Sequence, residues 1–284
     1  MWHDGHQRIN LEQASRYNVR MTHALTSERI ASLLRPAAQQ IDIRVVDETG
    51  STNADLLAAL PSLPAPTLLI AKSQTAGRGR AGREWLSAPG KSLTFSLAWK
   101  FSLPVHALVG LPLAVGVSIA ESLAMFHVQV RLKWPNDVLH EGRKLAGILI
   151  ESATAAHVPH DASWAVIGIG INIALSESMS AEIGRPVANI PWLAELDQDM
   201  LMATIASGLA EAMVQFEHEG LAAFTPRWNA LHAYAGQAVM ILDNGRLQHE
   251  GLAVGVDDIG RFLLDTPSGR TAIMAGDVSL RPKG

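Results

Sequence analysis

The chain has 284 residues, 48% of them hydrophobic and 18% charged; this is enough for one sizeable core, or for a large domain with a small one, and is not the composition of a disordered chain. The formal net charge of −4 does not favour a dedicated nucleic-acid binder, so any positive binding site must be local. The absence of cysteine excludes disulfides, thiolate zinc sites, iron–sulfur clusters and an enzyme thioester, and it fits a cytoplasmic location.

Residues 1–40 are predicted to form an N-terminal extension that is partly disordered. Residues 1–24 show no apolar period and lack the charged start and apolar core of a signal peptide. Their "HDGH" (3–6) could bind a metal weakly, although a mobile polar tail is the simpler interpretation. A helix is expected through "ERIASLLRPAA" (28–38), after a polar capping residue.

The first core strand is predicted at "IRVVDE" (43–48), and a short helix follows at "ADLLAAL" (54–60). Ser51, Thr52 and Asn53 lie between the two elements. They are ordinary helix-capping residues, and local sequence alone favours that role. They are also polar groups at a junction between a strand and a helix, where ligands often bind, so a binding role stays open.

The next elements are two strands that flank a loop. "PTLLIAKSQ" (66–74) and "SLTFSLAWK" (92–100) have the apolar patterns of strands. A buried helix is expected over residues 105–125. Polar and charged residues interrupt this segment, and no uninterrupted apolar stretch of the chain reaches the ~18–20 residues that a membrane span needs.

Two further apolar segments predict more strands of the same domain. Residues 130–152 are expected to form strands around a tight turn at "HEGR", and residues 163–175 form another strand. The glycines at positions 168 and 170 would allow a ligand or a second backbone to come close. Residues 199–234 have a helical pattern, with an uncertain boundary near "TPRW".

The pattern of apolar and turn-forming residues changes near residue 235. Short apolar runs are split there by turn signals, among them the hairpin signal Asp243-Asn244-Gly245. Several short strands at such spacing predict a small barrel of ~45–50 residues. The expected organisation is therefore a large domain over residues 41–235 and a small one over residues 236–284.

The loop "AGRGRAGREW" (76–85) combines three glycines with three arginines. Its "GRGRAG" fits the dinucleotide pattern G-x-G-x-x-G, but no apolar helix follows, so that interpretation is rejected. It could be a solvated loop without function. It could also be a clamp for anionic groups, because arginine binds carboxylate and phosphate oxygens bidentately and the glycines would let the segment close. Trp85 would then stack on a base or form an apolar lid.

A second polar group of residues follows in "KWPND" (133–137). Lys133 could be a surface lysine before a turn, yet Lys133, Asn136 and Asp137 stand beside two apolar strands. Asn172 adds a polar group to another apolar strand. Each could be a turn or core residue, but together with the arginine loop they suggest one site.

The chain contains five motifs whose sequences and order along the chain resemble the biotin protein ligase family, also called biotin–acetyl-CoA-carboxylase ligase. The resemblance is close over residues 41–175 and weaker through the C-terminal residues to "AGDVSLR" (275–281). The motifs are "STN" (51–53), "QTAGRGRAGREW" (74–85), "KWPND" (133–137), "KLAGILIE" (144–151) and "GIGINI" (168–173).

The resemblance implies an α/β fold, with a mixed-sheet catalytic domain related to class II aminoacyl-tRNA synthetases and lipoate ligases and a small SH3-like C-terminal barrel. It implies that biotin and ATP, with Mg²⁺, give biotinyl-5′-AMP, and that a lysine of the biotin carboxyl carrier protein then takes the biotinyl group. Because a carboxylate and a triphosphate repel each other, such an enzyme must position both and neutralise their charge.

The motifs also imply residue roles. Lys133 and Arg80 would be catalytic. The residues implied to bind biotin are Ser51, Thr52, Asn53, Gln74, Gly77, Arg78, Gly79, Arg80, Lys133 and Gly147. The residues implied to bind ATP are Arg83, Trp85, Lys133, Asn136, Asn172 and Arg281. No metal ligand is assigned, and Asp137 is only a guess for Mg²⁺.

The rival functions are a DNA-binding regulator and a lipoate ligase. Only about 40 residues precede the first core strand, and they lack the pattern of a winged helix-turn-helix, so we expect the monofunctional type that does not bind DNA. The arginine loop and "KWPND" favour biotin over lipoate. No membrane association is expected, and a homodimer through an exposed sheet edge is possible.

Overall fold

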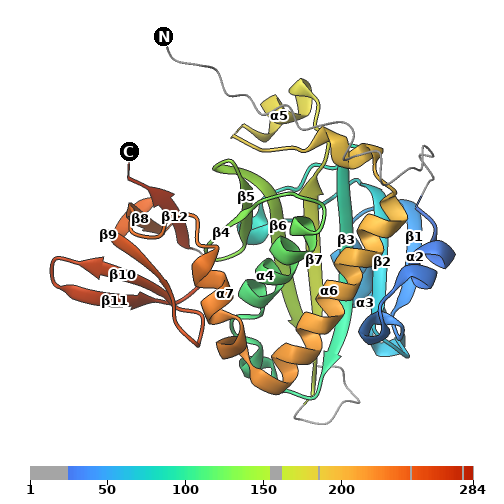
Figure 1. Cartoon of the computed structure of the whole chain (residues 1–284), viewed down its shortest axis with the longest axis horizontal. Helices are drawn as coiled ribbons and strands as arrows, with labels where there is room; N and C mark the ends of the chain where they lie inside the picture. Colours follow the sequence, from blue (N-terminus) through green and yellow to red (C-terminus); the bar gives the residue numbers. More distant parts are fainter. Residues whose placement is uncertain (1–24, 154–161, 185, 244, 277, 284) are drawn as a thin grey trace.

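The computed structural model describes residues 25–153, 162–184, 186–243, 245–276 and 278–283. Within them the chain forms a seven-stranded sheet in the order β1-β2-β3-β7-β6-β5-β4 and a separate five-stranded sheet in the order β11-β10-β9-β8-β12 (Figure 1). The predicted α/β class, with a mixed-sheet main domain and a small β-domain at the C-terminal side, is confirmed.

The large sheet is mixed because β1 and β2 pair in parallel, whereas the other neighbouring strands pair antiparallel. The central strands β3 and β7 are buried along almost their whole length, which explains why their sequences are nearly continuous apolar runs. The strands are β1 (Asp42–Thr49), β2 (Thr67–Gln74), β3 (Ser92–Phe101), β4 (Arg131–Lys133), β5 (Asp137–His140), β6 (Arg143–Ala153) and β7 (Ser163–Asn172).

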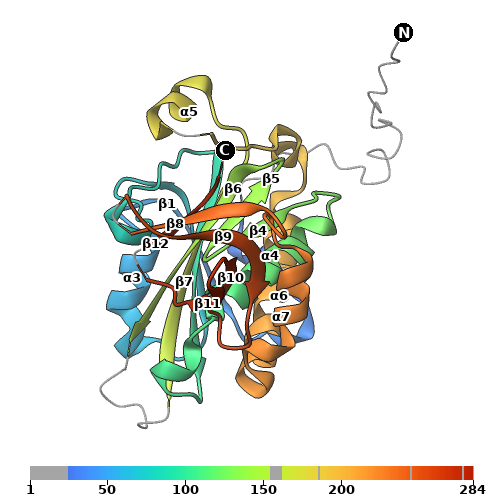
Figure 2. The same cartoon turned by 90° about the vertical axis from the view of Figure 1, so that its left-hand side faces the viewer.

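Helices cover both faces of this sheet. Helix α3 lies on one face, and α4 and α6 lie on the other (Figure 2). The longer pair packs against the sheet in one continuous apolar core, while α3 covers a small cluster around Leu56 and Trp164. The helices are α2 (Ser27–Leu33), α3 (Thr52–Ala59), α4 (Leu111–Ala124), α5 (Glu177–Ile183), α6 (Gln198–Glu219) and α7 (Thr225–Ala230).

The helix expected over residues 105–125 is wrong in its first part. A 3₁₀ turn spans Val105–Leu108, and α4 begins only at Leu111. Gly110 separates the two with a φ of 87°, and a Cβ there would come within 2.4 Å of Leu221. The left-handed conformation at this contact requires glycine and ends the first turn. None of the helices within the described ranges is long and apolar enough to cross a membrane.

The predicted N-terminal extension contains an ordered part. Residues 25–40 include α2 and a 3₁₀ turn, and Ile30, Leu34 and Ala38 are buried in the main core. Residues 1–24, with the "HDGH" segment, lie outside the described residues.

The strands of the small sheet that come first and last along the chain, β8 and β12, pair antiparallel with each other. Asp243 pairs with Arg246 at the predicted hairpin; Asn244 is not among the described residues. The strands are β8 (Ala238–Asp243), β9 (Arg246–Val256), β10 (Phe262–Thr266), β11 (Gly269–Ile273) and β12 (Val278–Pro282).

Edge strand β4 bonds to the segment between α7 and β8, and Trp134, which follows β4, bonds to the loop between β9 and β10. The amide of Leu132 donates to the carbonyl of Leu231 at 2.8 Å, and the amide of Ala233 donates to the carbonyl of Leu132 at 2.8 Å. The indole of Trp134 donates to the carbonyl of Gly260 at 3.2 Å. Lys133, which lies between these contacts in sequence, is therefore held beside the C-terminal sheet.

Candidate active site

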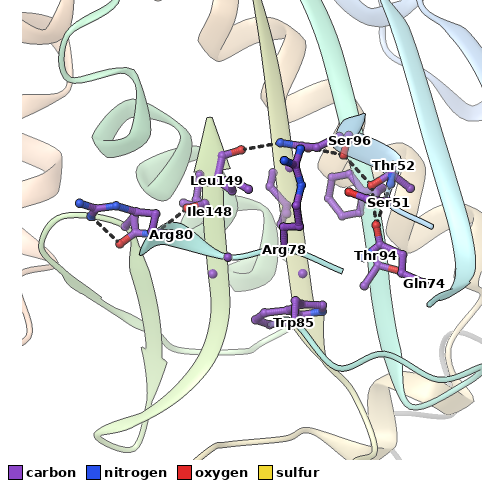
Figure 3. Close-up of a pocket in the computed structure, with 18 of the residues that line it drawn as sticks. Ser51, Thr52, Gln74, Arg78, Arg80, Trp85, Thr94, Ser96, Ile148 and Leu149 are labelled. Atoms are coloured by element: carbon purple, nitrogen blue, oxygen red, sulfur yellow. Dashed lines mark hydrogen bonds between the residues drawn. The ribbon is translucent and has the colours of Figure 1, made fainter. Parts of the chain in front are cut away.

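Two adjoining cavities lie over the large sheet. The first is lined by hydroxyl and amide groups and by apolar strand residues, and the second is lined by cationic side chains from both domains. Figure 3 shows Arg78 and Trp85 in the middle of the first cavity, with the hydroxyl and amide groups on one side and Arg80 on the other. The residues that line both cavities are Gly79, Arg80, Trp85, Asn136 and Lys144.

The polar side of the first cavity is a chain of hydrogen bonds, which we call the floor: Thr52, Asn53, Gln74 and Ser96. The amide of Thr52 donates to Oε1 of Gln74 at 2.8 Å, and the Thr52 and Ser96 hydroxyls lie 2.6 Å apart. The Ser96 hydroxyl donates to Oδ1 of Asn53 at 2.6 Å. The junction between β1 and α3 brings these groups together, so both interpretations of this junction apply: Ser51 caps α3, and its neighbours line a cavity.

The arginine loop folds into a short hairpin, which we call the lid (residues 77–85). The amide of Gly79 donates to the carbonyl of Arg83 at 2.7 Å, and the amide of Trp85 donates to the carbonyl of Gly77 at 2.9 Å. Ala81, at the tip, has a φ of 54°, which is strained for a residue other than glycine. The lid is therefore a defined turn, whose flanking glycines keep its backbone compact.

The two glycines of "GIGIN" make room for side chains. A Cβ at Gly170 would lie 2.2 Å from Cε2 of Trp85, and a Cβ at Gly168 would lie 2.3 Å from Oδ1 of Asn53. The close approach expected at these glycines is thus made by one lid residue and one floor residue. The indole nitrogen of Trp85 is buried and has no hydrogen-bond partner within the described part of the chain.

Four cations from the large sheet and the lid, with Arg281 of β12, make the second cavity positive. The carboxylate of Asp137 lies 2.5 Å from Nζ of Lys144 and 3.8 Å from Nζ of Lys133. One carboxylate thus holds two lysines in place without balancing the total charge. The cationic residues lining this cavity are Arg80, Arg83, Lys133, Lys144 and Arg281.

Arg80 connects the lid to both domains. Its Nη1 donates to Oδ1 of Asn136 at 3.1 Å, and its Nη2 donates to the carbonyl of Gly276, which lies between β11 and β12. Because Arg80 lines both cavities, its position depends on the C-terminal domain as well as on the large sheet.

Two titratable groups near the junction of the domains are shifted by their surroundings. Burial raises the pKa of Tyr234, and the charge of Asp137 raises it further, while Arg281 acts in the opposite direction. Burial lowers the pKa of His232 to about 4, so this imidazole is neutral at pH 7. His232 packs between the rings of Trp228 and Phe262, with centroids 5.0 and 5.5 Å away.

The residues singled out from the sequence are distributed unevenly over this site. Most of them line the first cavity, whereas Lys133, Arg83 and Arg281 line only the second. Gly77 and Asn172 line neither. The amide of Asn172 instead donates to the carbonyl of Lys144 at 3.2 Å, and Gly77 packs against the backbone of Trp85. Those lining the first cavity are Ser51, Thr52, Asn53, Gln74, Arg78, Gly79, Arg80, Trp85, Asn136 and Gly147.

Sequence reasoning missed several polar residues of the site, among them Thr94, Ser96, Lys144 and Glu151. Ser96 and Lys144 line the cavities, and Glu151 binds both Arg78 and Asn53. Lys144 begins and Glu151 ends the quoted motif "KLAGILIE", so a signal was present. Ser96 lies in an apolar strand and carries no such signal.

The described residues do not offer a metal site made by protein groups alone. They contain no group of three or more histidine, aspartate or glutamate side chains that could hold a metal ion. The carboxylate of Asp137 is already paired with two lysines, so it does not fit the role of a Mg²⁺ ligand.

A cavity of hydroxyls, amides and apolar groups that adjoins a strongly cationic one, beneath a lid that carries arginines, is typical of a protein that holds a small organic molecule beside an anionic one. The family named "Biotin/lipoate A/B protein ligase family" matches residues 43–172, and "Biotin protein ligase C terminal domain" matches residues 234–281. The chain belongs to the biotin protein ligases of this family.

Relatives match over most of the chain. The bifunctional ligase/repressor BirA of Escherichia coli is 35% identical over 84% of this chain and 74% of its own length. A biotin–acetyl-CoA-carboxylase ligase of Mycobacterium tuberculosis is 33% identical over 84% of this chain and 88% of its own. The biotin protein ligase of Aquifex aeolicus, solved in complex with biotin and ATP, superposes with a TM-score of 0.69 at 28% identity, over 85% of this chain and 99% of that one.

Proposed function

We propose that this chain is an ATP-dependent biotin–acetyl-CoA-carboxylase ligase. It joins biotin to AMP and transfers the biotinyl group to a lysine of the biotin carboxyl carrier protein. In this proposal residues 41–235 form the catalytic domain and residues 236–284 the small C-terminal domain. The named relatives and the neighbour bound to biotin and ATP support the proposal.

The first cavity suits biotin. Its floor offers hydroxyls and amides to a ureido ring, which has both donors and an acceptor. Its apolar walls suit the tetrahydrothiophene ring and the valeryl chain. The lid would exclude water and so protect the adenylate from hydrolysis. The apolar residues of this cavity are Phe95, Ile148, Leu149 and Ile169.

The second cavity suits the phosphates of ATP. Arg83, Lys133 and Arg281 would bind the triphosphate, and Trp85 would flank the adenine. Arginine and lysine contacts to phosphate oxygens are charge-assisted and stronger than neutral hydrogen bonds. Mg²⁺ would accompany ATP through phosphate oxygens and water, because the described protein groups do not fit its coordination.

The reaction belongs where the cavities meet. A carboxylate oxygen of biotin attacks the α-phosphorus of ATP, the bond to the leaving oxygen breaks, and pyrophosphate departs. The lysine amine of the carrier then attacks the mixed anhydride, and AMP leaves. Lys144 and Arg80 line both cavities, so they are the cations that can touch the carboxylate and the α-phosphate together. That shared lining carries the proposal.

The lining of the cavities supports a role for Lys144 that the sequence did not assign. Lys133 lines only the second cavity and lies 3.8 Å from Asp137, whereas Lys144 lies 2.5 Å from the same carboxylate and borders both cavities. We therefore propose Lys144, with Arg80, as the catalytic pair and retain Lys133 as a phosphate contact. A cytoplasmic location is part of the proposal, because ATP and the carrier protein are found there.

The test is mass spectrometry of a purified biotin carrier domain after incubation with this protein, MgATP and biotin. The expected result is addition of one biotinyl group to one lysine. Parallel reactions contain lipoate with a lipoyl acceptor domain, or lack ATP, and both should leave the acceptor unmodified. Lipoylation without biotinylation would make the protein a lipoate ligase, and no modification in any reaction would refute the proposal.

A further inference from the structure

Glu151, on β6, contacts both the lid and the floor. Its Oε1 and Oε2 accept from Nη2 of Arg78 at 3.2 and 3.0 Å. The same Oε2 accepts from Nδ2 of Asn53 at 2.9 Å. The carboxylate is thus the point where the lid, the first turn of α3 and β6 meet, and none of the roles proposed above uses it.

An ionised carboxylate accepts hydrogen bonds and cannot donate them. The amide nitrogen of Asn53 must therefore face Glu151, and its oxygen must face Ser96. Ser96 then uses its single hydrogen on Oδ1 of Asn53, so its oxygen can only accept from Thr52. The one hydrogen of the Thr52 hydroxyl is shared between Ser96 and Oε1 of Gln74, which lies 3.0 Å away. Through this chain, Glu151 sets the direction of the hydrogen bonds that a ureido group would meet on the floor.

The contact of Glu151 with Arg78 of the lid is weaker than its contact with Asn53 of the floor. The side chains of Arg78 and Glu151 are 47% and 29% exposed, so their ion pair is partly screened by water. The carboxylate engages only Nη2 of Arg78; no hydrogen bond within the described residues involves Nε or Nη1. Arg78 lines the first cavity, so these two nitrogens remain for a ligand while Glu151 holds the side chain in place.

We propose that Glu151 is a positioning residue that couples closure of the lid to the hydrogen-bond direction of the floor. It touches no reacting atom; it acts through Arg78 and Asn53. This inference rests on the proposed function, because it assigns the floor to biotin.

The test compares Glu151→Gln with the parent protein in two assays. In the protein without ligands, trypsin cleavage after Arg78 should become roughly fivefold faster, because a partly exposed ion pair of this kind holds the lid. In pyrophosphate exchange, KM for biotin should rise by about tenfold while kcat changes by less than about twofold, because a positioning role affects the population of the binding-competent form. The Glu151→Gln change should add little to KM in a protein that already carries Arg78→Ala.

Glu211→Gln is the matched control. Glu211 pairs with Arg35 at 2.8 Å on the far side of the molecule, with side-chain exposures of 49% and 39%. It should leave both trypsin cleavage and KM at parental values. Glu151→Asp is the second variant: it keeps the charge, but a side chain one methylene shorter cannot span both partners, so the same two shifts are expected if Glu151→Gln does not fold.

The outcomes separate this inference from the proposed function. Parental cleavage and parental KM in both Glu151 variants, with an active parent, would overturn the inference and leave the function intact. Tighter biotin binding by Glu151→Gln would also overturn it, because Glu151 would then compete with the ligand for Arg78. A parent that makes no biotinyl-AMP would refute the function, while faster cleavage in the variants would still support the link between lid and β6.

Discussion

The floor and the lid both contribute polar groups to the first cavity, but they are held in different ways. Thr52, Asn53 and Ser96 are at most 3% exposed and bond to one another across strands and a helix. Arg78 is 47% exposed and holds its place through Glu151. Breaking a buried hydrogen bond costs roughly 1–3 kcal/mol, whereas an exposed ion pair contributes about 0.2–1 kcal/mol.

This difference assigns separate tasks to the two regions. The floor forms when the protein folds, so its groups are ordered before a ligand arrives. The lid depends on a few surface contacts, and segments of that kind open at the low end of a protein's range of stability. Ligand charge can therefore act on the lid, while the floor discriminates by shape and hydrogen bonding.

The largest effect is expected where the two cavities meet, beyond the floor and the lid. Lys144→Ala should lower the rate of biotin-dependent pyrophosphate exchange by about 100- to 1000-fold, since it removes a cation from the transition state. Lys133→Ala should cost only about tenfold, because Lys133 borders the second cavity alone. The reverse order of the two variants would return the central role to Lys133.

A smaller effect is expected at Gly170, against which Trp85 of the lid packs. Gly170→Ala would place a methyl group 2.2 Å from the Trp85 ring, so Trp85 must move. The cost of such overpacking, about 1–3 kcal/mol, should appear as faster trypsin cleavage of the lid and weaker biotin binding. In Gly50→Ala the new methyl group meets no atom within 4 Å, and it should behave like the parent. Equal behaviour of the two variants would mean that the lid does not rest on Gly170.

The stability of the junction between the two domains should depend on pH. The pKa of His232 is lowered to about 4 from an ordinary value of 6.5, so the folded protein prefers the neutral ring. The stability that this preference confers is complete above pH 6.5 and is lost as the pH falls toward 4. The loss should reach about 2 kcal/mol at pH 5. Urea unfolding at pH 5 and pH 7.5 measures it, and His232→Phe should abolish this part of the pH dependence. An unchanged dependence in that variant would exclude His232 as its source.

The smallest expected effect is on the free energy of unfolding, which should fall more for a substitution in the floor than for one in the lid. Ser96→Ala leaves Oδ1 of Asn53 without its donor and should lower the free energy of unfolding by about 1–2 kcal/mol. Arg78→Ala should lower it by less than about 0.5 kcal/mol, because its ion pair is half exposed. Urea denaturation of both variants at neutral pH makes the comparison, and an equal loss would remove the distinction drawn between floor and lid.

The secondary structure was predictable where the sequence has a clear pattern of apolar residues. The strands β1, β2, β3 and β7 lie within a few residues of the expected ranges. Of these, β2, β3 and β7 are largely buried and are therefore nearly continuous apolar runs. The helix over residues 105–125 was not, because its interruption comes from a contact between Gly110 and Leu221 that no local pattern reveals.

The candidate site was predictable as a set of motifs but not as a set of contacts. The motifs contain most of the residues that line the first cavity, but they do not reveal that Lys144 lines both cavities. Only the pairing of β5 with β6 brings Lys144 beside Asp137. Asn172 shows the opposite case: the motif includes it, but its amide bonds to a backbone carbonyl.

The second cavity is bounded by Arg281 and its neighbours on β12 as well as by the large sheet, and Arg80 reaches from the lid to Gly276. The C-terminal domain is therefore not an interchangeable module. A chimera that takes residues 236–284 from a relative would change the lining of the second cavity directly, and it would change the first cavity only through Arg80. Divergence between relatives should accordingly be correlated between the lid and this domain, two segments nearly 200 positions apart along the chain.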